Sequence, residues 1–242
     1  MSQAPAHVDQ EALAQSLVEL QAPDGDSVDL QAGIERVVRG AAGVFAGTGV
    51  GLMLIAEDGH NLRYVASSDD VARRLEHAHE ASGEGPCVDS FVLDTRVMTE
   101  DLQTEPRWPE LRAQLRDEPI RAVLGLPTHV GAPVGTLNLY SDRPRRWHES
   151  EIGALEAYND LLEARLGGAL LARQHGHIVD QLQVALDSRV AIERAIGLLM
   201  GRDGVDGPSA FDKLRRAARN SRRRVSDVAE EVLAAHPHES VG

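Results

Sequence analysis

Residues 189–200, with the sequence RVAIERAIGLLM, decide the fold of the C-terminal part of the chain. Apolar side chains recur there at the three- and four-residue spacing of an amphipathic helix. The same spacing returns over residues 210–218 and 225–233, and a turn over 201–204 containing two glycines separates the first two stretches. The pattern therefore predicts three short helices joined by tight turns.

The connection between the second and third of these helices is strongly basic. Between Lys213 and Arg224 the chain carries seven cations and no acid, although its formal net charge is −13. Such a cluster favours an anionic partner such as nucleic acid, with a solvated helix face as the alternative. The candidate contacts are Arg215, Arg216, Arg219, Arg222 and Arg223, followed by Arg189, Arg194 and Arg202. Ala195 and Gly197 are expected to allow close packing or a close approach by the partner.

A longer helical pattern precedes this region. Over residues 161–199 apolar positions alternate by four and three, a period of about 3.5 residues that is typical of a coiled coil. We expect one long linking helix over residues 150–200 that forms a homodimer, with a bent helix packed on its own domain as the alternative. The seam is imperfect, because Gly168 and Gly176 weaken a helix and His175 is polar.

The centre of the chain alternates short apolar runs with turn residues. Two pairs of β-prone runs, over residues 49–66 and 122–140, each surround a turn that contains glycine, which predicts two hairpins. Residues 69–79 fit either a helix or a loop. Together with the flanking helical patterns, these runs predict an α+β domain over residues 28–172, preceded by a helical segment over residues 1–27.

The C-terminal pattern resembles the ANTAR domain over residues 181–236. The resemblance rests on Arg189-x-x-Ile192-Glu193-x-Ala195-x-Gly197-x-Leu199-Met200, Ala210-Phe211-x-x-Leu214-Arg215-x-x-Ala218 and Val228-Ala229. The resemblance implies an all-α three-helix module that binds hairpin loops in leader RNA. Binding favours the antiterminated transcript, and a dimer engages two loops. The family commonly has Lys where this chain has Ile196, so the affinity or the RNA target is expected to differ.

The central region resembles a GAF domain over residues 28–172. The resemblance rests on Gly83-Glu84-Gly85-Pro86-Cys87, Arg107-Trp108-Pro109 and Gly135-Thr136-Leu137-Asn138-Leu139-Tyr140. It implies an α+β sensor with a central antiparallel sheet, flanking helices and a pocket on one face. No cofactor is predicted. An unknown small-molecule ligand is expected in the pocket, because GAF ligands are too varied to be named from the fold. A GAF domain joined through a helix to an ANTAR domain is an actinobacterial arrangement.

Cys87 is the single cysteine of the chain and follows a Gly-Pro pair near the expected pocket. It is a candidate sensor residue for a ligand or for oxidation, although buried structural cysteines are commoner. His77, His79 and Glu80 are close in sequence, but we expect a solvent-facing helix there and no metal site. His129 is expected to be a satisfied strand histidine rather than a ligand contact.

The remaining sequence features limit the function. No catalytic motif is recognisable, so no enzyme is predicted. The apolar runs are far shorter than the roughly 20 residues of a membrane span, and no secretory signal is visible, so we expect a cytoplasmic protein without a membrane partner. The sequence predicts a signal-responsive RNA-binding regulator that acts by transcription antitermination. The alternatives are a DNA-binding transcription regulator, a coiled-coil protein-interaction sensor that binds no nucleic acid and, more weakly, a small-molecule enzyme.

Overall fold

A computed structural model describes residues 8–21, 29–45, 48–56, 61–172, 176–221, 223 and 225–235 of the chain. They form two compact units. One contains most of the chain up to Val179, and the other contains the chain from Asp180 onward. None of the described helices is both long and apolar enough to span a membrane.

Within the described residues, the first unit is built on a five-stranded sheet with the order β2-β1-β5-β4-β3. Its central pairings, β1 with β5, β5 with β4 and β4 with β3, are antiparallel. The α+β fold with a central antiparallel sheet is thus confirmed. The expected hairpin of β4 and β5 is present, and β1 lies next to β2, although the turn expected between these two strands lies outside the described residues. The strands are β1 (Thr48–Ile55), β2 (Leu62–Ser67), β3 (Val97–Thr99), β4 (Ala122–Val130) and β5 (Ala132–Ser141).

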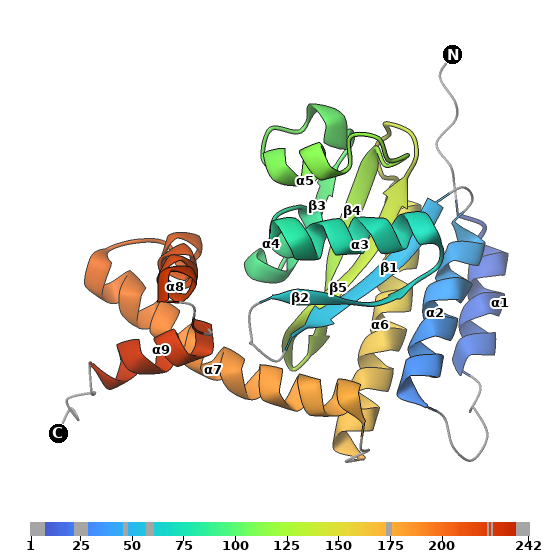
Figure 1. Ribbon diagram of the computed structural model, residues 1–242. Coiled ribbons are helices and arrows are strands. Elements are labelled where there is room, and N and C mark those ends of the chain that lie inside the picture. Colours follow the sequence, from blue (N-terminus) through green and yellow to red (C-terminus); the bar gives the residue numbers. More distant parts are fainter. Residues whose placement is uncertain are drawn as a thin grey trace. The chain divides into compact units, whose positions relative to one another are not determined.

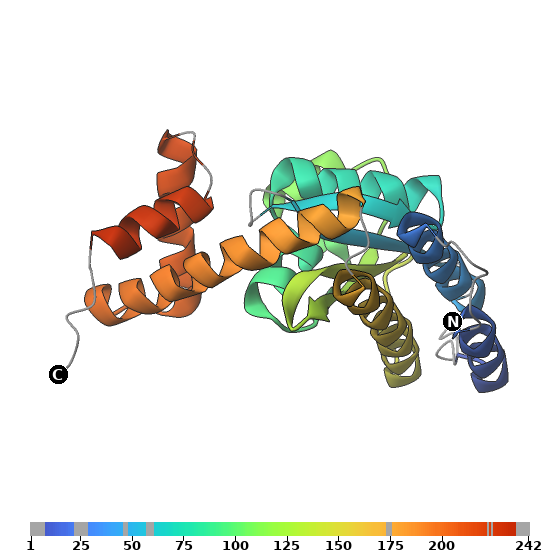
Figure 2. The ribbon, with the colours of Figure 1, turned by 90° about the horizontal axis from the view of Figure 1, so that it is seen from below.

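Helices cover both faces of this sheet (Figures 1 and 2). On one face, α3 packs on β2, α4 packs on β4 and β5, and α5 packs on α3. On the other face, α6 packs on β4 and α2, and α1 packs on α2 and α6. The helices are α1 (Gln10–Gln21), α2 (Leu30–Val44), α3 (Asp70–Ser82), α4 (Pro86–Leu93), α5 (Pro109–Gln114) and α6 (Glu149–Leu171), with a 3-10 turn η1 (Leu102–Thr104).

The segment that fitted either a helix or a loop is the helix α3. Asp69 caps its start by accepting a hydrogen bond from the backbone N–H of Ala72, and Gly83 ends it in the left-handed conformation with a φ of 66°. One face of α3 joins an apolar cluster, in which Leu75 packs with Trp108 and Leu111. Burial of this face holds α3 against the sheet.

The motif residues of the central region position the short helices α4 and α5. A carboxylate oxygen of Glu84 accepts hydrogen bonds from the first backbone N–H groups of α5, among them that of Leu111 at 3.0 Å. The indole N–H of the buried Trp108 donates to Asp89 of α4 at 2.9 Å. These contacts connect the turn before α4, and α4 itself, to the start of α5. The motif therefore fixes the position of the first turn of α4.

The linking helix differs from the expectation. Over residues 150–200 the structure has two helices, α6, which ends at Leu171, and α7 (His177–Asp203). His175, expected on the seam, lies outside the described residues. Glycine lowers helix stability by about 1 kcal/mol relative to alanine, and Gly167, Gly168 and Gly176 are concentrated around the break. Low local helix propensity therefore explains why the single helix predicted from periodicity is wrong.

The second unit contains α7 from Asp180 onward, α8 (Gly207–Ser221) and α9 (Val225–Ala234), which are the three helices that the sequence predicts. Helix α8 packs on α9. An ion pair of 2.8 Å between Lys213 Nζ and Asp203 Oδ2 joins α8 to the end of α7. Most of the predicted apolar positions are buried: Ile192, Ala195 and Leu199 of α7, Ala210, Phe211, Leu214 and Ala218 of α8, and Val225, Val228 and Ala229 of α9. Ala217, expected on the apolar face of α8, is exposed.

Candidate functional site

The described cations of the basic segment belong to α8 and to the connection before α9. Arg216 and Arg223 are exposed. Arg216 is 3.9 Å from Asp212, and Arg223 pairs with Glu231. Arg222 and the side chains of Arg215 and Arg219 lie outside the described residues. Since the apolar side chains of α8 are buried, the described cations of this segment point away from the core.

The candidate arginines of α7 are placed in two ways. Arg189 pairs with Glu193 at 2.7 Å, and Arg202 pairs with Asp203 at 2.6 Å. Arg194 is exposed, and within the described part of the chain no carboxylate lies in ion-pair range of it. The side chain of Arg189 is only 16% exposed, whereas that of Arg202 is 45% exposed, and an exposed ion pair contributes about 0–1 kcal/mol. Arg202 is therefore the more accessible of the two to an external phosphate.

Ala195 and Gly197 differ in their surroundings. Ala195 is fully buried and allows close packing within the chain. Gly197 is exposed, and a Cβ atom added there would meet nothing within 4 Å, which is also true of Gly201. Within the described residues Gly197 is therefore not closely packed, and a close approach by a partner remains the prediction there. With Arg194, the two glycines form one exposed face of α7 at i, i+3 and i+7 spacing.

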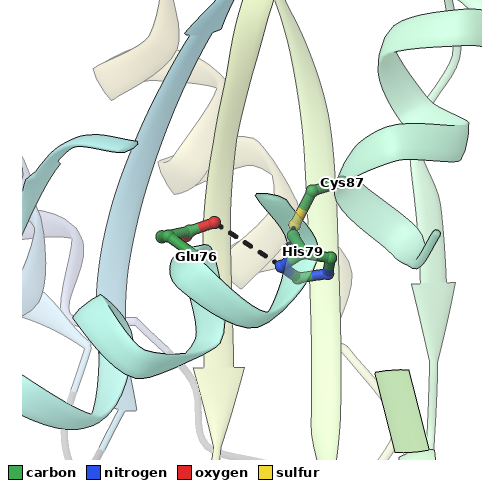
Figure 3. Close-up of side chains that lie close together, drawn as sticks. All are labelled: Glu76, His79 and Cys87. Carbon is green, nitrogen blue, oxygen red and sulfur yellow. Dashed lines mark hydrogen bonds and ion pairs between the residues drawn. The ribbon is translucent and has the colours of Figure 1, made fainter. Parts of the chain in front are cut away.

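A cluster of three ionisable side chains lies inside the first unit (Figure 3). Glu76 and His79 project from α3 and Cys87 from the first turn of α4, and each of the three is fully buried. Cys87 Sγ is 3.3 Å from His79 Nδ1, which is 3.6 Å from Glu76 Oε2. The amide nitrogen of Asn138 donates to both carboxylate oxygens of Glu76, at 3.0 and 3.1 Å.

This cluster corrects the expectation of a solvent-facing helix at His79. Of the three residues, His77 and Glu80 do lie on an exposed side of α3, where His77 Nδ1 is 3.8 Å from Glu80 Oε2. Burial, followed by the charge of Glu76, raises the pKa of the Cys87 thiol well above its ordinary value. A protonated thiol is a poor nucleophile, so direct oxidation of Cys87 is disfavoured.

Two glycines make room for this cluster. Gly51 of β1 and Gly125 of β4 lie on either side of Asn138 of β5 in the strand register. A Cβ atom at Gly51 would lie 2.0 Å from Glu76 Oε1, and one at Gly125 would lie 3.2 Å from the backbone oxygen of Pro86. The row Gly51-Asn138-Gly125 therefore lets α3 and the start of α4 approach the sheet closely.

The spacing of residues along α3 carries a signal for part of this cluster. Ala72, Leu75, Glu76 and His79 stand at i, i+3, i+4 and i+7, the spacing of the buried face of a helix. Two polar residues on such a face need buried partners. Asn138 and Gly51, by contrast, carry no local signal that connects them to α3.

His129 is a satisfied strand histidine at the surface. Its imidazole contacts Asp94 and Glu163, and its side chain is 37% exposed. The described residues also line an open surface depression of about 580 Å³ at β3 and η1. This depression does not include Cys87 or His129; its lining includes Met98, Thr99, Asp101, Glu105, Pro106 and Arg145.

Two known families match this chain. A family model described as GAF domain matches residues 29–166, more than half of the chain. The chain belongs to the GAF family. A second model, described as ANTAR domain, matches residues 180–233. The GAF–ANTAR chain is thus a signal-regulated regulator, with a sensor domain followed by a regulatory domain of an RNA-binding family.

Solved structures similar to this GAF–ANTAR chain share its first unit. The GAF domain of Acinetobacter phosphoenolpyruvate-protein phosphotransferase has a TM-score of 0.54 at 17% identity, over 69% of this chain and 95% of that one. Free methionine-R-sulfoxide reductase from Neisseria meningitidis, in complex with its substrate, has a TM-score of 0.53 at 16% identity, over 71% and 98%.

A phycoerythrobilin-bound GAF domain from a cyanobacterial phytochrome is similar at a TM-score of 0.52 and 14% identity, over 69% of this chain and 100% of that one. No curated protein matches the sequence. At these identities the structural likeness establishes the fold of the GAF domain and nothing about its ligand.

Proposed function

We propose that this protein is an RNA-binding regulator that acts by transcription antitermination, with the ANTAR module binding leader-RNA hairpins under control of the GAF domain. The observation that carries the proposal is the run of seven cations without an acid between Lys213 and Arg224, within the ANTAR match of a chain whose net charge is −13. Phosphate groups are the ligands that such a segment attracts.

The exposed ion pairs of the ANTAR module support the proposal that its arginines bind phosphate. On the surface, Arg216 pairs with Asp212. Arg223 pairs with Glu231 and also donates to the backbone oxygen of Asp227. Exposed ion pairs of this kind are weak in water. RNA phosphates can exchange with these carboxylates without unfolding α8, because the apolar side of that helix is buried separately. The affinity for RNA should therefore depend steeply on salt.

The face of α7 formed by Arg194, Gly197 and Gly201 offers a second contact. A guanidinium beside two positions without side chains lets an RNA backbone come close to the helix. Ile196, where the family commonly has Lys, is half-buried. We infer that Arg194 supplies a cation in this part of the interface.

We further propose that the protein works as a homodimer. Of the expected seam, Ala164 and Gly168 are exposed on α6, and Leu171 is 86% exposed at its end. Ile192 and Leu199 are buried within the chain. The dimer would therefore use α6 rather than one continuous coil. The parent protein should sediment as a dimer, and Leu171→Asp should lower its sedimentation coefficient at the same protein concentration. A parent protein that sediments as a monomer would refute the dimer.

The test of the proposed function starts with the full-length protein and total cellular RNA. RNA that co-purifies is sequenced, and the enriched hairpins are compared with duplex DNA of the same length at matched salt. Preferential, salt-sensitive binding of the hairpins is the expected result. Preference for duplex DNA would instead identify a DNA-binding regulator. Binding of neither at low salt would leave a protein-interaction sensor.

A further inference from the structure

We propose that Glu76, His79 and Cys87 form a binding site for a divalent metal ion of the Zn²⁺ type. One ligand atom from each side chain lies within 4.8 Å of the others, and all three side chains are fully buried. The site deepens the sensor half of the proposed function, because it names a class of ligand for the GAF domain. It does not depend on RNA binding.

The distances between the ligand atoms fit a metal site. Around a tetrahedral Zn²⁺ with bonds of about 2.0–2.3 Å, neighbouring ligand atoms are about 3.3–3.7 Å apart. The separations of His79 Nδ1 from Cys87 Sγ and from Glu76 Oε2 are 3.3 and 3.6 Å. One nitrogen atom thus lies at the required distance from both a sulfur and an oxygen. These three side chains need only small movements to share one cation.

The chemistry of the three ligands favours the same class of ion. A thiolate, an imidazole and a carboxylate together suit borderline cations such as Zn²⁺, whereas Mg²⁺ and Ca²⁺ prefer oxygen ligands alone. With Glu76 and Cys87 bound as anions, a divalent ion would make the site electrically neutral. Neutrality matters here, because buried charges are strongly unfavourable unless they are paired or coordinate a metal.

The surrounding residues supply the support that metal ligands require. The amide of Asn138 binds both carboxylate oxygens of Glu76 and so fixes the orientation of this ligand. Gly51 leaves the space that Glu76 occupies, and Gly85 leaves the space beside the imidazole of His79. Among the described residues, no hydrogen-bond partner is found for the buried atoms His79 Nε2 and Asn138 Oδ1. Buried polar atoms normally have hydrogen-bond partners, so unsatisfied atoms in this cluster call for an explanation other than core packing.

Three protein ligands leave a fourth coordination position for water or for a small molecule. Metal binding would transfer the thiol proton of Cys87 to solvent as the metal–sulfur bond forms. It would join α3 to α4, both of which pack on the sheet. The ordering of these two helices gives the metal a physical means of changing the GAF domain.

The test uses the full-length protein, stripped of metal by chelator and kept reduced with a phosphine, and needs no RNA. Titration with Co²⁺ should give the visible bands of a tetrahedral site and a thiolate-to-cobalt charge-transfer band, saturating at one equivalent. Zn²⁺ should abolish these bands by displacement and raise the melting temperature. A titration without the charge-transfer band would overturn the proposal, whether or not RNA is bound.

Matched variants identify the ligands. Cys87→Ser should remove the charge-transfer band, and His79→Gln should remove tetrahedral binding. His77→Gln changes an exposed histidine on the same helix and should leave the titration unchanged. Asn138→Ala should weaken Zn²⁺ binding about 10- to 100-fold, as loss of a residue that orients a ligand does. Equal effects of His77→Gln and His79→Gln would contradict the assignment. The titration of the parent protein decides whether the site binds metal. The test therefore remains decisive even if a variant folds poorly.

Discussion

His129 Nε2 lies 2.7 Å from Asp94 Oδ1, so strand β4 is joined to the residue that ends α4. On its other side, Nδ1 of the same imidazole is 3.2 Å from Glu163 of α6. Asn159 donates a hydrogen bond to that Glu163 carboxylate at 2.9 Å. The imidazole thus lies between two carboxylates and connects elements from both faces of the sheet.

This arrangement predicts a pH-dependent contribution to stability. Burial lowers the pKa of His129, but hydrogen bonds to Asp94 and Glu163 and their charges outweigh it, so the pKa is raised. The contribution to stability is complete when the pH is below the pKa of His129 in the unfolded chain, about 6.5. It disappears as the pH rises through the pKa of His129 in the folded protein. It should be about 0–1 kcal/mol, because the side chain is 37% exposed and screened.

The measurement is urea unfolding of the parent protein and of His129→Gln across this pH window, with the imidazole followed by NMR. The difference in unfolding free energy between the two proteins should shrink as the pH rises. A His129 resonance that titrates below the ordinary histidine value would contradict the prediction.

Gly85→Ala should destabilise the GAF domain by about 2 kcal/mol or more, from backbone strain and crowding together. The φ of Gly85 is 130°, and an added Cβ would lie 2.4 Å from Cδ2 of His79. Gly131→Ala is the matched control, because its φ is 74° but nothing lies within 4 Å of the new atom. It should cost only the backbone strain, about 1–2 kcal/mol. Equal losses in urea unfolding would show that His79 does not crowd this position.

Gly197 offers a test that separates stability from RNA binding. Gly197→Ala should raise the unfolding free energy by about 1 kcal/mol, because an exposed helical glycine is replaced without a clash. Gly197→Leu should keep the fold and weaken RNA binding by blocking the approach of the backbone. Gly153→Leu on α6, also exposed and uncrowded, is the control. Unaltered RNA affinity of Gly197→Leu would remove this face from the interface.

Arg194→Ala should weaken hairpin binding and reduce the salt slope of the logarithm of the binding constant by about one unit. The reason is that one phosphate contact, and the counterion it releases, would be lost. Filter binding or fluorescence anisotropy over a salt series gives the slope. Arg73→Ala removes an exposed arginine of the GAF domain that pairs with Asp70 and should have no effect. An unchanged slope for Arg194→Ala would exclude a phosphate contact there.

The periodicity of the sequence was sufficient for most elements. The hairpins, the three C-terminal helices and their buried faces follow from local spacing, because helices and strands bury side chains with fixed periods. The same reasoning failed where local propensity and periodicity disagreed. The four-and-three pattern continues through Gly168 and Gly176, yet the structure has two helices there.

By itself, the sequence determined the order of the two domains, the elements within each and the concentration of cations near the C-terminus, all of which depend on neighbouring residues. Only the tertiary structure decided that Cys87, His79 and Glu76 meet, and that Asn138, 62 residues from Glu76, orients its carboxylate. Strand register and the two glycines on either side of Asn138 create that meeting, and both are properties of the packed sheet. No local pattern along the chain records which distant residues a sheet will place side by side.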